Sequence, residues 1–317
     1  MKIVPVKQLL EGKNYSIYRM DFHSLTELEM FLEGGPKVNH EIFPVQKSVE
    51  MPESFAGESL IRSIGYCHGG YQNGFELFLQ MKKELESANV KYEYFRRSVP
   101  AVVGSRPHVP NFVAGTPKTM YRLDRVKEKK FVDIYINLVY SGVTTQEQII
   151  NRGILTLNLI SLFEQHSIAV NLYAFEASYL ANEIFIADIK LKKPGQSLNV
   201  GKCYYPLCGR EFVRRLLVRV KESMPFQQNW GRGYGSVLPE SLLKQCMNIG
   251  ENTILIRSPI EMGIKGKNIY EDADIFFDQL HLSKEIQVPK YREYMDRTPV
   301  ARDENGRYQS GKAGSRK

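Results

Sequence analysis

Side chains that could bind a ligand follow one apolar run of the chain, at the point where that run ends. The run, from residue 131 to 139, is too continuous for a strand with one wet face and is typical of a strand covered on both faces. Asn137, Ser141 and Thr144 come at its end. Ligands of open α/β sheets bind beyond the carboxyl ends of the strands. We therefore expect the loop from 140 to 144 to be a binding loop, with these three residues as its binding groups.

The same loop is a poor place for a metal ion. Ser141 and Thr144 are weak candidates for metal ligands, and Asn137 offers an amide oxygen. A hard cation such as Mg²⁺ prefers anionic oxygen ligands. We therefore disfavour Mg²⁺ and predict no metal site, no cofactor and no catalytic residues.

A basic segment from 210 to 223 is the second candidate for a binding surface. At helical spacing its apolar residues form one face, so that its cations lie mainly on the other. The cations are Arg210, Arg214, Arg215, Arg219 and Lys221. We predict Arg210, Arg214 and Arg215 as phosphate-binding residues. The alternative is that this face is the solvated exterior of an ordinary helix.

Carboxylates and thiols give weaker signals for catalysis. Asp133, Glu183 and Asp188 lie near predicted strands and would be the candidates in a metal-dependent nuclease. No two of them sit together at a strand end with a lysine, as such nucleases need. His68 stands beside Cys67, but no third group completes a nucleophilic site. Free thiols are expected for the four cysteines, which are Cys67, Cys203, Cys208 and Cys246.

The order of elements places the binding loop inside a strand–helix–strand unit over residues 127–178. Thr144 and Glu147 form a predicted capping box, and the helix that follows is apolar nearly all round, which predicts burial. A second strand over 168–175 completes the unit. The later predictions are strands over 183–191 (antiparallel or at an edge) and 253–257, and helices over 210–223, 238–247 and 272–280. This order predicts an α/β fold, a three-layer sandwich with a mainly parallel sheet.

Composition changes along the chain suggest four parts. Residues 99–126 are rich in Pro and Gly, and we interpret them as a strap that packs across the sheet through its valines and Phe112, although a functional loop is the alternative. Ser24 and Glu27 form a second predicted capping box, after a strand. The predicted parts are a smaller α+β region over 1–98, the strap over 99–126, the α/β domain over 127–289 and a basic, disordered tail over 290–317.

Half of the formal net charge of +8 lies in the tail, where eight Lys or Arg face four Asp or Glu. The rest of the chain is close to balanced, so the tail is either a nucleic-acid arm or an aid to solubility. No apolar run reaches the roughly 18 residues that a membrane span needs, and the N-terminus lacks the pattern of a signal peptide. We expect no membrane partner and a cytoplasmic location.

The predicted core resembles the von Willebrand factor A domain, a Rossmann-like fold. In that family the first strand ends in Asp-x-Ser-x-Ser, whose oxygens bind Mg²⁺. Here Asn137 takes the place of Asp and Val139 that of the first Ser, and only Ser141 matches. The resemblance therefore implies the fold with a degenerate metal site.

Four ordered segments resemble an uncharacterised protein family of bacteriophages and prophages. They are SFAGES (54–59), VGSRPHVPNFVAGTPKTM (103–120), VDIYINL (132–138) and INRGILTLNLISLFEQHSIAVNLYAF (150–175). The resemblance implies a phage-type origin, and hence the cytoplasm of a bacterial host cell, but no activity.

Together these features predict a binding protein. We expect a non-enzymatic binding or assembly module of phage or mobile-element origin, which docks on a protein or nucleoprotein partner through the loop from 140 to 144. The competing hypothesis is a nucleic-acid-binding protein or nuclease that uses the basic segment 210–221 and the tail.

Overall fold

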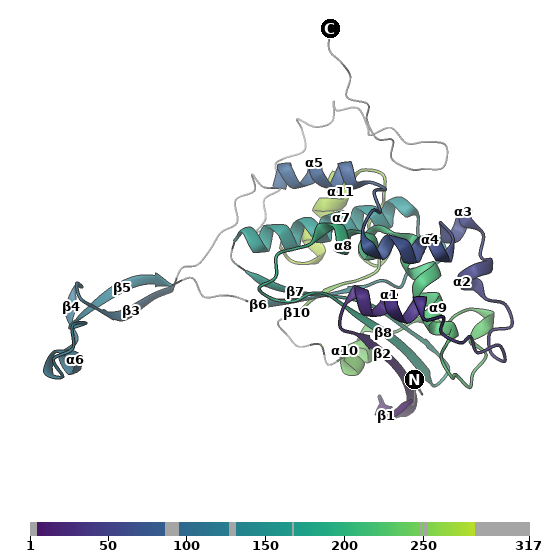
Figure 1. Cartoon of the computed structure of the whole chain (residues 1–317), viewed down its shortest axis with the longest axis horizontal. Helices are drawn as coiled ribbons and strands as arrows, with labels where there is room; N and C mark the ends of the chain where they lie inside the picture. The colour runs from purple at the N-terminus through teal and green to yellow at the C-terminus, as the bar shows by residue number, and fades with distance from the viewer. Residues whose placement is uncertain are drawn as a thin grey trace, which may run out of the picture.

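A mixed β-sheet forms the centre of the computed structural model, and helices cover it (Figure 1). The structure describes residues 5–85, 95–126, 131–166, 168–247, 249 and 253–282. The predicted tail over 290–317 lies outside these residues. The strands of the central sheet are β1 (Val6–Leu10), β2 (Lys13–Phe22), β6 (Phe131–Asn137), β7 (Ala169–Leu180), β8 (Glu183–Lys192), β9 (Ser236–Val237) and β10 (Thr253–Ile256).

The strands of this sheet finish at two opposite ends. The order is β1-β2-β8-β7-β6-β10, with β9 paired to β7. β6 is parallel to both β7 and β10, and β2 is parallel to β8, but β7 and β8 are antiparallel. We call the end where β6, β7 and β10 finish the β6 end, and the end where β2 and β8 finish the β8 end. The predicted α/β class is confirmed, with a mixed sheet in which β8 is antiparallel to β7 but lies inside the sheet.

The two faces of the sheet are covered unequally. Most helices pack on the face that holds the larger hydrophobic core (Figure 1). They are α1 (Leu25–Glu33), α4 (Leu60–Gly65), α5 (Phe75–Leu85), α7 (Gln146–Gln165), α8 (Val200–Cys208) and α11 (Ile269–Gln279). Among the described residues, α10 (Glu240–Met247) is the helix whose side chains join the smaller core on the other face, where Leu242 and Leu243 lie with Phe175. The second helical layer of the predicted sandwich is therefore reduced to one short helix.

The N-terminal part of the chain belongs to the same sheet and core. β2 pairs with β8, and its Tyr18 and Met20 lie in the larger core with residues of α7. Residues 6–22 of the predicted region over 1–98 therefore share one sheet with the strands of the predicted α/β domain. The remaining short elements of the body are α2 (Lys47–Glu50), α3 (Glu53–Ala56), η1 (Tyr66–His68), η2 (Phe212–Leu217), α9 (Val218–Glu222) and η3 (Trp230–Arg232).

The central helix α7 begins one residue later than predicted. Thr145 is its N-cap: the Thr145 hydroxyl accepts from the amide of Gln148, and the Gln148 side chain accepts from the amide of Thr145. The predicted box of Thr144 and Glu147 is wrong because two consecutive threonines each precede a Glu or Gln by three residues, so the motif fits in two registers. The burial predicted for this helix is confirmed, since most of its residues are buried on all sides.

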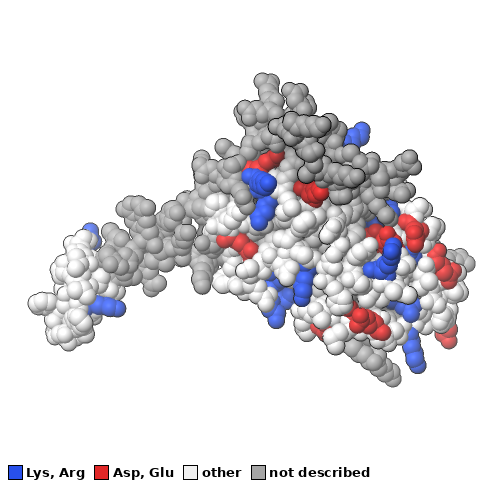
Figure 2. All heavy atoms as spheres, turned by 45° about the horizontal axis from the view of Figure 1, so that its top comes forward, with Lys and Arg blue, Asp and Glu red and all other residues white. Residues whose placement is uncertain are grey.

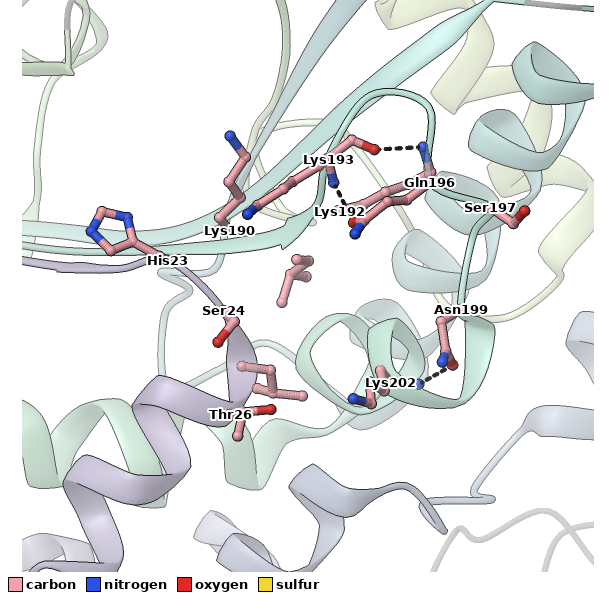
Figure 3. A pocket seen from close by; sticks show the side chains of 12 residues that line it. His23, Ser24, Thr26, Lys190, Lys192, Lys193, Gln196, Ser197, Asn199 and Lys202 are labelled. Atoms are coloured by element: carbon pink, nitrogen blue, oxygen red, sulfur yellow. Dashed lines mark hydrogen bonds between the residues drawn. The ribbon is translucent and has the colours of Figure 1, made fainter.

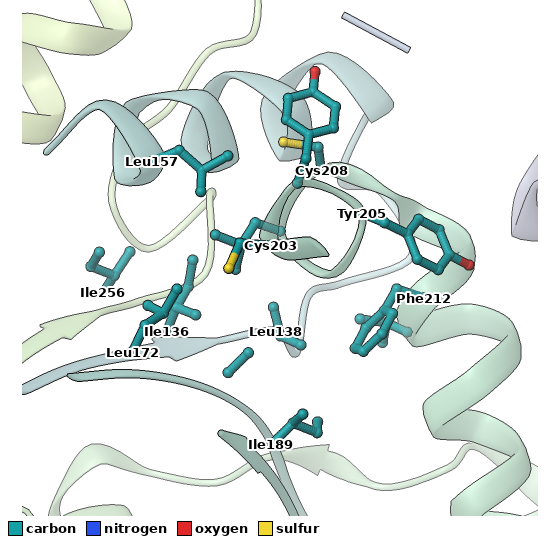
Figure 4. Close-up of a cluster of buried hydrophobic side chains, with 14 of the residues drawn as sticks. Ile136, Leu138, Leu157, Leu172, Ile189, Cys203, Tyr205, Cys208, Phe212 and Ile256 are labelled. Atoms are coloured by element: carbon teal, nitrogen blue, oxygen red, sulfur yellow. The ribbon is translucent and has the colours of Figure 1, made fainter. Parts of the chain in front are cut away.

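α7 packs closely on α8, and of the two cysteines of α8, Cys203 faces the sheet while Cys208 lies against α7 (Figure 4). A Cβ atom on Gly153 of α7 would lie 2.5 Å from the Cys208 sulfur, so glycine is required for this approach. Cys203 and Cys208 are free and buried, as predicted, and burial raises the pKa of the Cys203 thiol to about 12. These thiols are therefore core residues.

The segment predicted as a strap forms a small sheet of its own. β3 (Phe95–Ala101), β4 (Arg106–Pro107) and β5 (Met120–Val126) make this sheet, and α6 (Val109–Val113) lies between β4 and β5 in the chain. It stands apart from the central sheet in Figure 1. Its expected apolar anchors are exposed: Val102 64%, Val103 76%, Val109 62%, Phe112 71% and Val113 79%. The predicted packing across the sheet is therefore wrong, because the backbone of this segment pairs with itself.

Candidate functional site

The three residues predicted for the binding loop face in different directions at the β6 end. Asn137 is buried, and its Oδ1 accepts from the amide of Val139 at 2.9 Å. Thr144 is also buried, and its hydroxyl has no hydrogen-bond partner among the described residues. Ser141 is exposed. The structure thus brings the three residues to one end of the sheet without joining their side chains into one ligand set.

A buried arginine that the sequence pattern did not mark fills the space behind this loop. The Nη1 of Arg152, on α7, donates to the carbonyls of Asn137 at 2.6 Å and Arg257 at 3.2 Å. These carbonyls follow two adjacent parallel strands, β6 and β10. Burial lowers the pKa of the Arg152 guanidinium to about 10. The place where a doubly wound fold would bind its ligand is therefore occupied by a side chain of the protein itself.

The predicted phosphate-binding arginines donate to backbone carbonyls, and two of them are buried. Arg215 is 1% exposed and donates five hydrogen bonds to carbonyls of residues 48–58, at 2.8 to 3.3 Å. Arg214 donates to the carbonyl of Phe55 at 2.6 Å and covers the Phe55 ring. Arg210, on the surface, donates to carbonyls of the same segment. The expectation that these cations form an exposed helix face is wrong for Arg214 and Arg215, because the segment around α2 and α3 packs over them.

The carboxylates considered for a nuclease also have protein partners. Glu183 accepts from Tyr18, the Trp230 indole and two backbone amides at 2.8 to 3.0 Å. Asp133 accepts from the Asn171 side chain at 2.7 Å. Asp188 lies 3.4 Å from Arg19, and burial raises the pKa of its carboxyl to about 6. These three carboxylates lie at separate places and make no common site.

A cavity lined by cations lies at the opposite end of the sheet, the β8 end (Figure 3). Its volume is about 490 Å³, and its lining includes His23, Lys190, Lys192, Lys193 and Lys202. Hydroxyl and amide side chains complete the polar lining: Ser24, Thr26, Gln196, Ser197 and Asn199. Among the described residues that line it, none is a carboxylate. We call this cavity the lysine pocket.

One buried ion pair fixes the wall of the lysine pocket. Lys192 is 3% exposed, and its Nζ lies 2.7 Å from the Glu164 carboxylate and donates to the carbonyl of Val170 at 2.9 Å. The other oxygen of Glu164 accepts from the amide of Leu198 at 3.1 Å. Glu164, near the end of α7, therefore holds both the strand and the loop that carry the pocket residues. Lys192 is a structural cation, whereas Lys193 and Lys202 are exposed to solvent.

Two helices begin at the lysine pocket. Ser24 caps α1, and its hydroxyl accepts from the amide of Glu27 at 3.2 Å, which confirms the predicted cap. The Glu27 carboxylate accepts from the amide of His23 at 2.7 Å, so this helix start already has one anionic partner. Asn199 caps α8 from across the pocket, and its side chain accepts from the amide of Lys202 at 3.1 Å. The partial positive charges of the two helix starts add to those of the lysines.

The ionisable side chains that line the lysine pocket are all basic. On the face shown in Figure 2, acidic and basic side chains are interspersed. The pocket instead gathers cations from β8, from the turn after it and from α8. Its arrangement can bind an anion with several oxygen atoms, such as a phosphate group.

The sequence contains a signal for this pocket. Lys190, Lys192, Lys193 and Lys202 lie within thirteen residues, at a strand end and a helix start. No helix is predicted over residues 200–208. In the structure Pro206 lies inside α8, and Asn199 supplies the start of that helix.

Comparison with known proteins gives a family and no activity. A family model described as a domain of unknown function (DUF7192) matches residues 5–284. The match spans the central sheet, its helices and the small separate sheet. No curated protein and no solved structure matches the chain. Within the described residues, no helix is both long enough and apolar enough to pass through a bilayer.

Proposed function

We propose that this chain, which belongs to the DUF7192 family, is a non-enzymatic binding module that docks on a nucleoprotein partner through the phosphates of its nucleic acid. The observation that carries the proposal is the lysine pocket, whose lining combines four lysines and two helix starts and, among the described residues, includes no carboxylate. Ammonium groups bind phosphate as point charges, and helix starts add backbone donors. The lining thus supplies groups that bind an anion.

The surroundings of Lys190 favour nucleic acid over a free anion or an acidic protein. Lys190 borders the pocket, but its side chain points away from the cavity (Figure 3), and its Nζ lies 5.0 Å from the centre of the Tyr173 ring. Tyr173 in turn stacks on Tyr135, with ring centres 4.5 Å apart and planes at 7°. These residues form a row across β8, β7 and β6. Cations beside an aromatic row are the combination that single-stranded nucleic acids use, since phosphates and bases then both find partners.

The loop from 140 to 144 is our proposed contact with the protein component of the same partner. Val143 is 78% exposed at the tip of this loop, and Phe55 lies beside Gly142 with 38% exposure. An apolar tip next to an aromatic ring suits a protein surface. The phage or mobile-element origin suggested by the sequence resemblance accords with an assembly role of this kind.

The proposal is tested by reversing the charge at the two exposed lysines of the pocket. A Lys193→Glu, Lys202→Glu variant should bind a short, labelled single-stranded oligonucleotide about tenfold or more weakly than the wild type, equal to roughly 1.4 kcal/mol. Fluorescence anisotropy measures the affinity over a series of salt concentrations. The slope of log affinity against log salt should fall by about 1.4, because each lost phosphate contact accounts for about 0.7 in single strands.

A matched control distinguishes the loss of a specific phosphate site from a general effect of net charge on oligonucleotide binding. Lys13 and Lys37 are exposed, and neither lines the pocket. A Lys13→Glu, Lys37→Glu variant has the same net charge as the test variant, and we expect it to bind nearly as well as the wild type. Equal affinities in the two variants, whether both weakened or both unchanged, would refute the lysine pocket as the phosphate site.

A further inference from the structure

A second group of chemically active side chains lies on the other half of α1. Glu29 and Glu33 are four residues apart on this helix and so lie on the same side of it. His68 ends η1, which packs against α1. One ligand atom from each of the three residues lies within 4.8 Å of the others. The cluster joins two segments that are far apart in the sequence.

The buried member of this cluster lacks a hydrogen bond. Glu29 is 3% exposed, and its Oε1 lies 2.8 Å from the Nε2 of His68. This oxygen receives no hydrogen bond from any described residue, His68 included. With a protonated imidazole this contact is an ion pair. With a neutral imidazole that does not donate, the buried carboxylate oxygen is left without a donor, which is costly, and a cation beside both atoms satisfies it.

We propose that Glu29, Glu33 and His68 bind one divalent transition-metal ion of the Zn²⁺ class. Carboxylate oxygen and imidazole nitrogen are ligands of Zn²⁺, at about 2.0–2.2 Å from the ion, so that two ligands of one ion lie ~3–4 Å apart. The observed separations come near this range, and the exposed side chains of Glu33 and His68 can turn to reach it. The imidazole favours a transition metal over Mg²⁺ or Ca²⁺, which prefer oxygen ligands alone.

The position of the site assigns the ion a structural role. Two ligands come from α1 and one from η1, so the ion ties the helix to the segment that follows α4. The start of the same helix lines the lysine pocket through Ser24 and Thr26. The neighbouring Cys67 lies in the hydrophobic core, which leaves the three residues as the ligands. Three protein ligands leave at least one coordination position for water.

Titration of the EDTA-treated chain with Zn²⁺ tests the site. We expect one ion per chain by calorimetry and a rise of the melting temperature by about 5 °C when free Zn²⁺ is a hundredfold above its dissociation constant. Mg²⁺ at the same concentration should leave the melting temperature unchanged. Co²⁺ should give visible bands without the near-ultraviolet absorption of a thiolate ligand, because no cysteine takes part.

Variants of the two exposed ligands make the test specific. His68→Asn and Glu33→Gln should keep the fold, since both side chains face solvent, and each should weaken Zn²⁺ binding more than tenfold. His40→Asn is the matched control, because His40 is exposed and lies outside the cluster. It should bind like the wild type. Unchanged Zn²⁺ affinity in both His68→Asn and Glu33→Gln, or no binding to the wild type, would overturn the proposal. Neither result bears on the lysine pocket, so the two proposals fail independently.

Discussion

The two ends of the central sheet differ in the burial of their basic side chains. At the β6 end, Arg152 and Arg215 are buried and donate to backbone carbonyls. At the β8 end, Lys193 and Lys202 are exposed around a cavity. A basic side chain in the sequence therefore does not by itself mark a binding surface. What decides is whether another segment of the chain packs over it.

The difference follows from the chemistry of the two side chains. The planar guanidinium offers five donors, and Arg215 uses them on the carbonyls of a segment that has no regular sheet or long helix to pair with. The ammonium group of lysine is strongly hydrated and stays in water unless a carboxylate pairs with it, as Glu164 does with Lys192. Arginine thus secures irregular backbone at one end, and lysine remains accessible at the other.

The largest effect that the comparison predicts is the loss of an arginine from the β6 end. Arg215→Ala should lower the free energy of unfolding by more than about 3 kcal/mol, because several buried carbonyls lose their donors. Urea denaturation followed by circular dichroism measures the change. Arg62→Ala is the control: its side chain is 71% exposed, and its loss should cost less than about 1 kcal/mol. Similar costs for the two variants would show that Arg215 does not hold the segment from 48 to 58.

The sequence predicted the elements well and the surroundings of their charged residues poorly. The buried helix α7, the strand before it and the Ser24 cap follow from hydrophobic period and capping chemistry, which are local. The packing of residues 48–58 over Arg214 and Arg215 joins parts of the chain more than 150 residues apart, and no local pattern records it. The same holds for β2, which enters the sheet beside β8.

The proposed phosphate-binding lysines were missed for a related reason. The lysine pocket exists only because β8 reverses direction relative to β7, which moves the end of β8 away from the end of β6. A mainly parallel sheet places most strand ends together and directs attention to Asn137, Ser141 and Thr144, and the strand over 183–191 was predicted only as antiparallel or at an edge. The cluster of lysines near 190 and 202 can be seen in the sequence. Its location at a separate end of the sheet follows only from the direction of β8.

A smaller effect on the free energy of unfolding is expected from the titration of Asp188, which lies two residues before Lys190 on β8. Burial raises the pKa of its carboxyl from 3.8 to about 6, since its ion pair with Arg19 offsets only part of the desolvation. The folded state therefore binds a proton that the unfolded state releases between about pH 4 and pH 6. The free energy of unfolding should fall as the pH rises through this window and stay level above it.

Asp188→Asn removes this contribution. Between pH 4 and pH 7 the wild type should lose roughly 1–3 kcal/mol relative to the variant, as measured by urea denaturation at each pH. Other carboxylates titrate in both proteins and cancel in the difference. If the free energy of unfolding depends on pH in the same way in both proteins, the pKa of Asp188 is not raised by folding. Its pairing with Arg19 would then fully offset its burial.

The most direct test of the central claim is lysine footprinting by mass spectrometry with and without a saturating single-stranded oligonucleotide. The claim is that the β8 end binds phosphate. An amine-reactive label should modify Lys193 and Lys202 several times more slowly in the complex, while the exposed Lys13 and Lys37 react at unchanged rates. Undiminished labelling of Lys193 and Lys202 in the saturated complex would contradict the account.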